Sequence, residues 1–183
     1  MKEQYKSFLN KSIWVILILF MIRCFAAWKF FDGGFSGYDL YGYAGEAIGV
    51  GTLIMCLYEK WIWRWMFFEK TPKLEKKYIG TFISNFDQAE REATLIIKQS
   101  LLFVHVEFRS GESISRSLTA SIDDIIGVPQ LTYCYLNTPD IAFRDRSEIH
   151  YGTAMLRIVE DGNLVGEYFT DRNTCGDMVF HKI

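Results

Sequence analysis

The most constraining feature of this sequence is a pair of apolar stretches within its first 68 residues. The run IWVILILFMI at residues 13–22 is uninterrupted, and apolar character continues around Arg23 to residue 31. A second apolar stretch extends from about residue 41 to residue 63. Because about 20 apolar residues cross the hydrocarbon core of a bilayer, residues 1–68 are predicted to form two membrane-spanning helices, at about 8–31 and 41–63.

The alternative interpretation of the first stretch is a cleavable signal peptide, since three lysines precede a short apolar run. No small-x-small cleavage site follows it, and Arg23 before Cys24 does not fit a lipoprotein-type site. A signal peptide would also leave the second stretch unexplained. Two membrane helices are therefore the preferred interpretation.

Basic residues flank the two stretches on the outside of the pair, and the connecting sequence FDGGFSGYDL holds two aspartates and no basic residue. The flanking basic residues are Lys2, Lys6, Lys11, Lys60, Arg64, Lys70, Lys73, Lys76 and Lys77. Since cytoplasmic flanks carry an excess of Lys and Arg, both ends of the chain are predicted to be cytoplasmic. In a bacterium the connection would be periplasmic.

Two charged residues, Arg23 and Glu46, lie inside the predicted spans. Arg23 lies 12 residues before a turn centre near Phe35, and Glu46 lies 11 residues after it. An antiparallel hairpin would place them at similar depth, which predicts an intramembrane ion pair. The alternative is that each side chain reaches the outer interface separately.

The second span also contains Gly45 and Gly49 at small-xxx-small spacing. Such a spacing lets two helices approach closely. The partner is either the first helix of the same chain or a helix of another protomer, and the motif does not decide between them.

After a charged linker at 69–77, EKTPKLEKK, the apolar period changes to two and no convincing amphipathic helix follows. Turn signals such as RSGES, EDGN and DRNTCGD separate short strands. The predicted strands are 78–84, 92–99, 101–109, 113–122, 129–137, 149–159, 163–170 and 176–182. Eight strands joined mostly by hairpins predict an eight-stranded antiparallel, lipocalin-like β-barrel over 78–183.

Alternation along these strands predicts which side chains share a face. His150 shares a face with small or apolar residues at 152, 154, 156 and 158, which we expect inside. Other shared faces are polar: Leu131, Tyr133, Tyr135 and Asn137; Ser113, Ser115 and Ser117; Leu164, Gly166, Tyr168 and Thr170. If these faces point inward, their hydroxyls need partners that a ligand would supply; the alternative is that they face solvent. The long connection at 138–148 is a candidate lid or rim loop.

Charge and motifs exclude several functions. Residues 1–68 carry a net charge of +2 and residues 69–183 one of −4, so the barrel is a poor binder of long nucleic acid. The four cysteines show no CxxC spacing, and no metal-ligand or catalytic motif is present. The sequence therefore predicts a protein that is not an enzyme, with no metal and no cofactor.

Several stretches carry a resemblance to a known family. They are the two-helix hairpin, GTF at 80–82, SISRS at 113–117, LTYCYLNTP at 131–139, HYGTAMLRI at 150–158 and GEYFTDRNTCG at 166–176. With these, nearly the whole chain resembles the two-transmembrane β-barrel effectors of bacterial anti-phage signalling by cyclic oligonucleotides, the SMODS-associated two-transmembrane, β-strand-rich family. GTF stands where lipocalin-like barrels often have Gly-x-Trp.

The resemblance implies a cytosolic barrel, anchored in the bacterial inner membrane, that binds a cyclic di- or trinucleotide made by a partner synthase. Binding in this family is taken to drive self-association through the membrane helices, inner-membrane disruption and death of the infected cell. The alternative function is a membrane-tethered barrel that holds a lipid or other apolar molecule, and a third class is an unusual membrane enzyme. A nucleotide site needs inward polar side chains, whereas a lipid cavity would be mostly aliphatic.

A cyclic dinucleotide presents two phosphates, two riboses and two base faces. Phosphates call for guanidinium or hydroxyl donors, so Arg172 is the first candidate for a phosphate contact. Its alternative is pairing with Asp171 or Glu167 at a hairpin end.

The remaining candidates would contact bases and riboses. Tyr133, Tyr135 and Tyr168 are candidate stacking or hydroxyl contacts, with ordinary barrel packing as the alternative. The candidates for ribose or base edges are Asn137, Thr170, Ser115 and Ser117. His150 is expected to be a barrel histidine with satisfied hydrogen bonds rather than a ligand contact.

Overall fold

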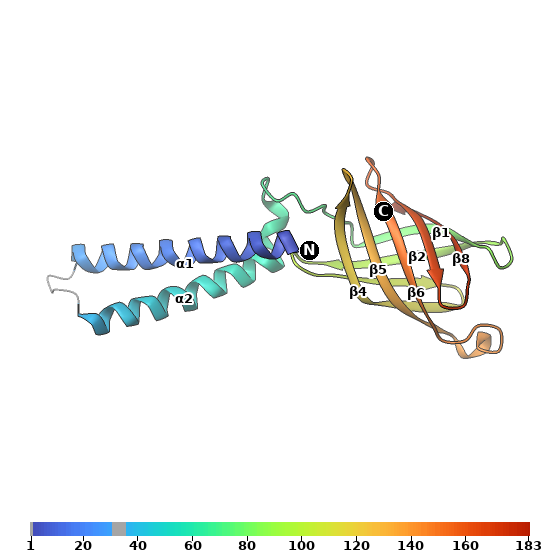
Figure 1. Ribbon diagram of the computed structural model, residues 1–183, viewed down its shortest axis with the longest axis horizontal. Helices are drawn as coiled ribbons and strands as arrows, with labels where there is room; N and C mark the ends of the chain where they lie inside the picture. Colours follow the sequence, from blue (N-terminus) through green and yellow to red (C-terminus); the bar gives the residue numbers. More distant parts are fainter. Residues whose placement is uncertain (1, 31–35) are drawn as a thin grey trace. The chain divides into compact units, whose positions relative to one another are not determined.

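The computed structural model describes residues 2–30 and 36–183, which form two compact units, Met1–Glu69 and Lys70–Ile183. The first unit holds two long helices, α1 (Lys2–Phe30) and α2 (Gly37–Lys60), followed by the short 3-10 helix η1 (Ile62–Trp65). The helices pack against each other as a hairpin (Figure 1). The predicted turn centre near Phe35 lies outside the described residues.

Local hydrogen bonds set where α2 begins. The Ser36 hydroxyl accepts from the Asp39 backbone N–H at 3.3 Å, and the Asp39 carboxylate accepts from the Ser36 N–H at 3.1 Å. This capping box satisfies two amides that a helix start leaves without partners. The helix therefore starts at Gly37, four residues before the apolar stretch that begins at about 41, because the capping box and not hydropathy determines its N-terminus.

Both helices are long and apolar enough to cross a membrane by length and composition. Their large apolar side chains are mostly exposed, among them Trp14, Ile18, Met21 and Leu53. Exposed apolar faces of this extent are typical of surfaces that meet lipid or another protein.

The α2 residues that pack toward α1 are Ala47, Gly51 and Met55, spaced four apart. A Cβ added at Gly51 would lie 2.6 Å from the Ile16 side chain, so α1 approaches α2 closely there. Around the corresponding points at Gly45 and Gly49, no described atom lies within 4 Å. The structure therefore brings Gly51 against α1, and leaves the small-xxx-small pair open.

The two charged residues of the predicted spans lie together. The Arg23 Nε–H donates to Glu46 Oε2 at 2.8 Å, and the guanidinium lies 4.5 Å from the centre of the Tyr43 ring. An intramembrane location for this pair stays a prediction.

The second unit is an eight-stranded antiparallel β-barrel in which β1 pairs with β8 to close the sheet, as predicted (Figure 1). Its strands are β1 (Lys77–Ser84), β2 (Glu90–Gln99), β3 (Val104–Ser110), β4 (Ser113–Ile125), β5 (Val128–Pro139), β6 (His150–Ile158), β7 (Leu164–Thr170) and β8 (Cys175–Lys182). β3 begins three residues later than predicted, because Ser100 and Phe103 close a turn through a 2.8 Å backbone hydrogen bond.

The segment predicted as a charged linker is partly packed on the barrel. Leu74 belongs to the barrel core, and its backbone N–H donates to the Gln99 side chain at 2.9 Å. The Gln99 amide in turn donates to the Pro72 carbonyl at 2.8 Å. The Gln99 side chain on β2 thus binds the backbone of residues 72 and 74, in the segment that precedes β1.

Inward side chains change in character along the barrel. At one end they are apolar, including Tyr78, Leu95, Leu131, Leu156 and Phe180, all essentially inaccessible to solvent. At the other end each strand from β1 to β7 presents a polar inward residue, and one further polar residue directly precedes β8. These residues are Ser84, Arg91, Ser110, Ser113, Asn137, His150, Thr170 and Thr174, with Thr174 directly before β8. The barrel therefore has a packed apolar end and a polar end.

Candidate ligand-binding cavity

A cavity of about 250 Å³ occupies the polar end of the barrel. All eight polar inward residues line it, together with aromatic side chains from β1, β3, β5 and β7. Barrels of this strand number are either filled by side chains or hold one small ligand. Here the same barrel is filled at its apolar end and hollow at its polar end.

Two buried polar atoms in the cavity lining have no hydrogen-bond partner among the described residues. They are Tyr133 Oη and Asn137 Oδ1, and Tyr133 is only 2% exposed. Burial raises the pKa of the Tyr133 phenol, so its hydroxyl stays protonated and able to donate. An unpaired buried polar atom costs about 1–3 kcal/mol, so each atom calls for a partner inside the cavity.

The hydrogen bonds of His150 explain why Asn137 Oδ1 has no partner among the described residues. His150 Nδ1 lies 2.8 Å from the Glu148 carbonyl, which can only accept, so Nδ1 carries the proton. Nε2 is then an acceptor for the Asn137 amide N–H at 3.4 Å. This contact fixes the Asn137 amide, and its oxygen remains unpaired in the cavity lining.

The aromatic side chains of the lining form two groups of contacting rings. The Tyr133 and Tyr135 ring centres are 5.8 Å apart, and Phe82 packs edge-on against Tyr168 at 6.3 Å and Phe108 at 5.4 Å. A Cβ at Gly152 would lie 2.4 Å from the end of the Tyr135 ring, so this glycine makes room for Tyr135.

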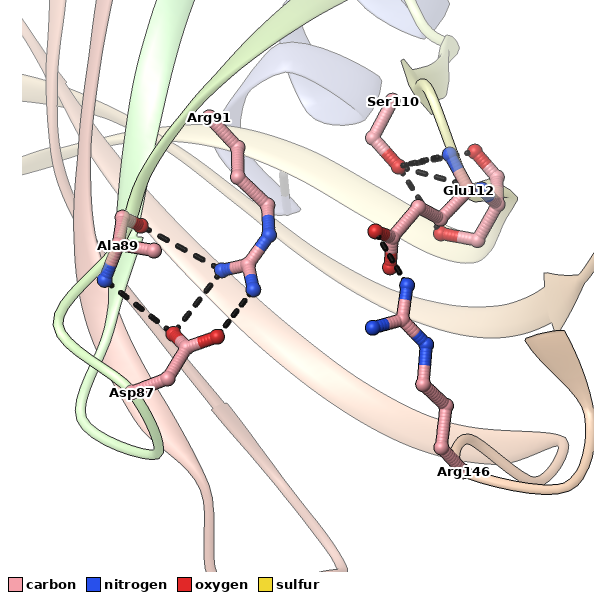
Figure 2. Close-up of polar contacts among 7 residues, drawn as sticks. Asp87, Ala89, Arg91, Ser110, Glu112 and Arg146 are labelled. Carbon is pink, nitrogen blue, oxygen red and sulfur yellow. Dashed lines mark hydrogen bonds and ion pairs between the residues drawn. The ribbon is translucent and has the colours of Figure 1, made fainter.

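Five charged residues line the cavity, and we call them the charged rim: Asp87, Arg91, Glu112, Arg146 and Arg172. Figure 2 shows two ion pairs within it, Arg91 with Asp87 and Arg146 with Glu112. The third guanidinium, that of Arg172, donates to the Ser147 hydroxyl at 3.2 Å. The formal charge of the rim is +1.

Arg172 does not take the predicted alternative partners within the described part of the chain. The Asp171 carboxylate instead accepts from the Tyr151 backbone N–H at 3.2 Å. Arg172 therefore contacts a hydroxyl of the 138–148 connection, and this connection forms part of the cavity lining through Phe143, Arg146 and Ser147.

Seven of the eight predicted ligand-binding residues line the cavity. They are Arg172, Tyr133, Tyr135, Tyr168, Asn137, Thr170 and Ser115. Ser117 is not among the lining residues; its hydroxyl accepts from the Val106 backbone N–H at 2.9 Å, next to an irregularity in the β4–β5 register. Direct ligand contact by the seven stays a prediction. His150 lines the cavity as well as having its own partners.

The prediction from sequence missed Arg91 and Arg146. Arg91 shares the inward alternation of Ala93, Leu95 and Ile97 on β2, so parity alone could have identified it. Arg146 lies in a connection without any period, and no sequence signal points to it. Across residues 2–30 and 36–183, no group of three His, Cys, Asp or Glu side chains is placed to hold a metal ion.

Comparison with known proteins places this barrel in a family. The family model described as Cap15, cyclic dinucleotide receptor domain, matches residues 69–182, which is more than half of the chain. The chain belongs to the Cap15 family. The resemblance stated from the sequence is thereby confirmed.

A relative extends the match to the whole chain. It is the CD-NTase-associated protein 15 of Staphylococcus schleiferi, which is 27% identical over 187 residues, covering 100% of each chain. The matched length includes the helical hairpin as well as the Cap15 barrel.

Proposed function

We propose that this protein is a membrane-anchored effector whose barrel binds a cyclic dinucleotide in the cavity. The observation that carries the proposal is a polar cavity with three guanidiniums around it and two buried atoms, Tyr133 Oη and Asn137 Oδ1, that have no partner in the described part of the chain. Guanidiniums match phosphates, aromatic faces match bases, and the unpaired atoms match the donors and acceptors of a base edge. Membership of the Cap15 family supports the same ligand class.

The alternative of a lipid-binding barrel fits the lining less well. An apolar ligand would leave the Tyr133 hydroxyl and the Asn137 oxygen unpaired in the complex, with their desolvation uncompensated. It would also leave the three guanidiniums without a counterpart on the ligand. A nucleotide can satisfy both sets of groups.

The binding experiment is a titration of residues 70–183, and of the full chain in detergent, with a panel of cyclic di- and trinucleotides. We expect saturable binding of at least one cyclic dinucleotide by both proteins, with circular dichroism showing that the fragment is folded. No response to any cyclic nucleotide, together with saturable binding of a fatty acid or phospholipid, would replace this proposal by the lipid-binding one.

We further propose that ligand binding drives self-association of the helices in the bacterial inner membrane, with both termini and the barrel in the cytoplasm, and that the resulting membrane disruption kills the cell. The open face at Gly45 and Gly49 supports an association between protomers, since α1 packs elsewhere on α2. Replacing both glycines by leucine is expected to leave ligand binding unchanged and to reduce the ligand-dependent increase in particle size and the toxicity. Val50→Phe, at an exposed position about 100° around the helix from Gly49 and so away from the Gly45–Gly49 face, is the bulk control.

The Arg23–Glu46 pair gives a second test of the membrane segment. Glu46→Lys is expected to lower protein level or toxicity, because two like charges would share one depth in the hydrocarbon. The exchanged pair, Arg23→Glu with Glu46→Arg, should restore both. Wild-type protein level and toxicity in Glu46→Lys would rule out an intramembrane pair.

A further inference from the structure

The two ion pairs of the charged rim are built from separate parts of the barrel. Asp87 lies in the β1–β2 connection and Arg91 near the start of β2, while Glu112 lies in the β3–β4 turn and Arg146 in the 138–148 connection (Figure 2). Both arginines line the cavity. The cavity therefore has two guanidiniums from different rim segments, and each already holds a carboxylate.

We propose that Asp87 and Glu112 occupy, in the empty barrel, the places that the two phosphates of the ligand take in the complex. Binding then exchanges carboxylate for phosphate on Arg91 and on Arg146. This inference rests on the proposed function. It adds the residues that bind the phosphates, and a competition by Asp87 and Glu112 that lowers the affinity for the ligand.

The geometry of each pair suits such an exchange. Arg91 binds Asp87 through both terminal nitrogens, one of them 3.1 Å from Oδ1, and Arg146 Nη2 lies 2.6 Å from Glu112 Oε1. Carboxylate and phosphate both present two oxygens to a guanidinium edge. A phosphodiester can therefore replace the carboxylate without a new orientation of the arginine.

Aromatic rings hold the two guanidiniums near the cavity independently of the acids. The Arg91 guanidinium lies 6.0 Å from the centre of the Phe82 ring, and that of Arg146 lies 4.9 Å from the centre of the Phe143 ring. Both rings also line the cavity. Because the rings contact the guanidinium faces, the arginines keep a support when the acids move away.

The two acids are held differently in their turns. The Asp87 carboxylate also accepts from the Ala89 backbone N–H at 3.2 Å, so it keeps a partner when it is released from Arg91. For Glu112 it is the backbone that is held, through its N–H, which donates to the Ser110 hydroxyl at 3.4 Å. Each pair is also partly open to water: the side chains of Arg91 and Asp87 are 28% and 33% exposed, and those of Arg146 and Glu112 are 59% and 37% exposed. Exposed pairs are weak, so a ligand with two phosphates can break them.

The electrostatic consequence is that the two acids offset two of the three guanidiniums and lower the attraction of the rim for anions. The hydrogen bond from Arg91 holds the pKa of Asp87 below its usual range, so Asp87 is charged near neutral pH. The pKa of Arg91 is raised, chiefly by its bond to Asp87 and also by the charge of Glu112, so the two pairs interact. Neutralising both acids would raise the formal rim charge from +1 to +3 and remove the competitors for the phosphates.

The test uses the full chain in detergent, with Asp87→Asn, Glu112→Gln and the double variant, titrated with a cyclic dinucleotide that the wild type binds. The amides are isosteric with the acids, and the side chain introduced by Asp87→Asn keeps an oxygen for the Ala89 N–H. We expect each single change to tighten binding about two- to five-fold, and the double variant to combine both gains. Adding Arg91→Ala and Arg146→Ala to the double variant should remove the gain.

Glu107→Gln is the matched control. Glu107 is paired with Arg109 and Arg116 and alternates with the buried Val106 and Phe108, so it lies on the outer face of β3. The substitution removes the same charge without changing the cavity, and the affinity of this variant should equal that of the wild type. Unchanged or weaker binding by the Asp87 and Glu112 variants overturns the exchange; weaker binding would mean that the acids position the arginines or contact the ligand. If the wild type binds no cyclic dinucleotide of the panel, the proposed function itself is overturned.

Discussion

Tyr133→Phe is expected to stabilise the empty barrel and to weaken ligand binding at the same time. In the absence of ligand the Tyr133 hydroxyl is buried without a partner in the described residues, so its removal should raise the free energy of unfolding by about 1 kcal/mol. In the complex the same hydroxyl would donate or accept a hydrogen bond, and its loss should weaken binding about tenfold. Urea unfolding and ligand titration of the same variant measure the two effects.

Tyr78→Phe is the matched control for this prediction. Tyr78 is as buried as Tyr133, but its hydroxyl accepts from the Glu75 backbone N–H at 3.0 Å and it lies at the apolar end of the barrel. Loss of the Tyr78 hydroxyl should lower the free energy of unfolding by about 1 kcal/mol and leave the affinity unchanged.

Combining Tyr133→Phe with Arg172→Ala should lower the affinity about 100-fold or more, since a charged contact is lost as well. Unchanged binding in the combined variant would contradict the site.

Gly80→Ala is expected to destabilise the barrel strongly. A Cβ at Gly80 would lie 1.9 Å from the Val179 carbonyl oxygen and 2.7 Å from Phe180 Cα, both of them backbone atoms of β8. Gly80 pairs with Phe180 in the β1–β8 ladder that closes the barrel, so the strands would have to separate where the sheet joins itself. Overpacking of this kind costs about 3 kcal/mol, measured as a shift in the urea midpoint.

Gly111→Ala serves as the control for the glycine change itself. It lies in the β3–β4 turn, and no described atom comes within 4 Å of its added Cβ. Its effect should stay within about 0.5 kcal/mol. If Gly80→Ala and Gly111→Ala had equal stability, close contact between β1 and β8 at this position would be excluded.

Residue alternation was sufficient to predict the strand number, the closure into a barrel and which residues share a face, whereas the structure decided that the tyrosine and serine faces point inward. Tyr133, Tyr135 and Asn137 follow each other at every second residue of β5, and all three line the cavity. Ser117 marks the limit of this rule. It shares the alternation of Ser113 and Ser115, but its hydroxyl replaces a backbone acceptor for Val106, which depends on the register of β3 against β4.

In the helical hairpin, too, the sequence predicted the elements but not which of their faces meet. Apolar length and composition predicted two helices that could span a membrane, and similar spacing from the turn predicted that Arg23 and Glu46 would be neighbours. The face of α2 that meets α1 was not determined by the glycine spacing. Gly51 approaches α1 and Gly45 does not, because rotation of a helix about its axis is decided by packing against its partner.

The sequence by itself therefore determined the elements and which residues share a face, because strand period and helix length are local properties of the chain. The family followed from the resemblance of particular stretches, such as HYGTAMLRI at 150–158. Only the tertiary structure decided the charged rim and the unpaired atoms. Glu112 and Arg146 are 34 residues apart and meet only when the 138–148 connection reaches the β3–β4 turn. The Tyr133 hydroxyl lacks a partner only because eight strand ends enclose a space that no side chain of the described barrel fills.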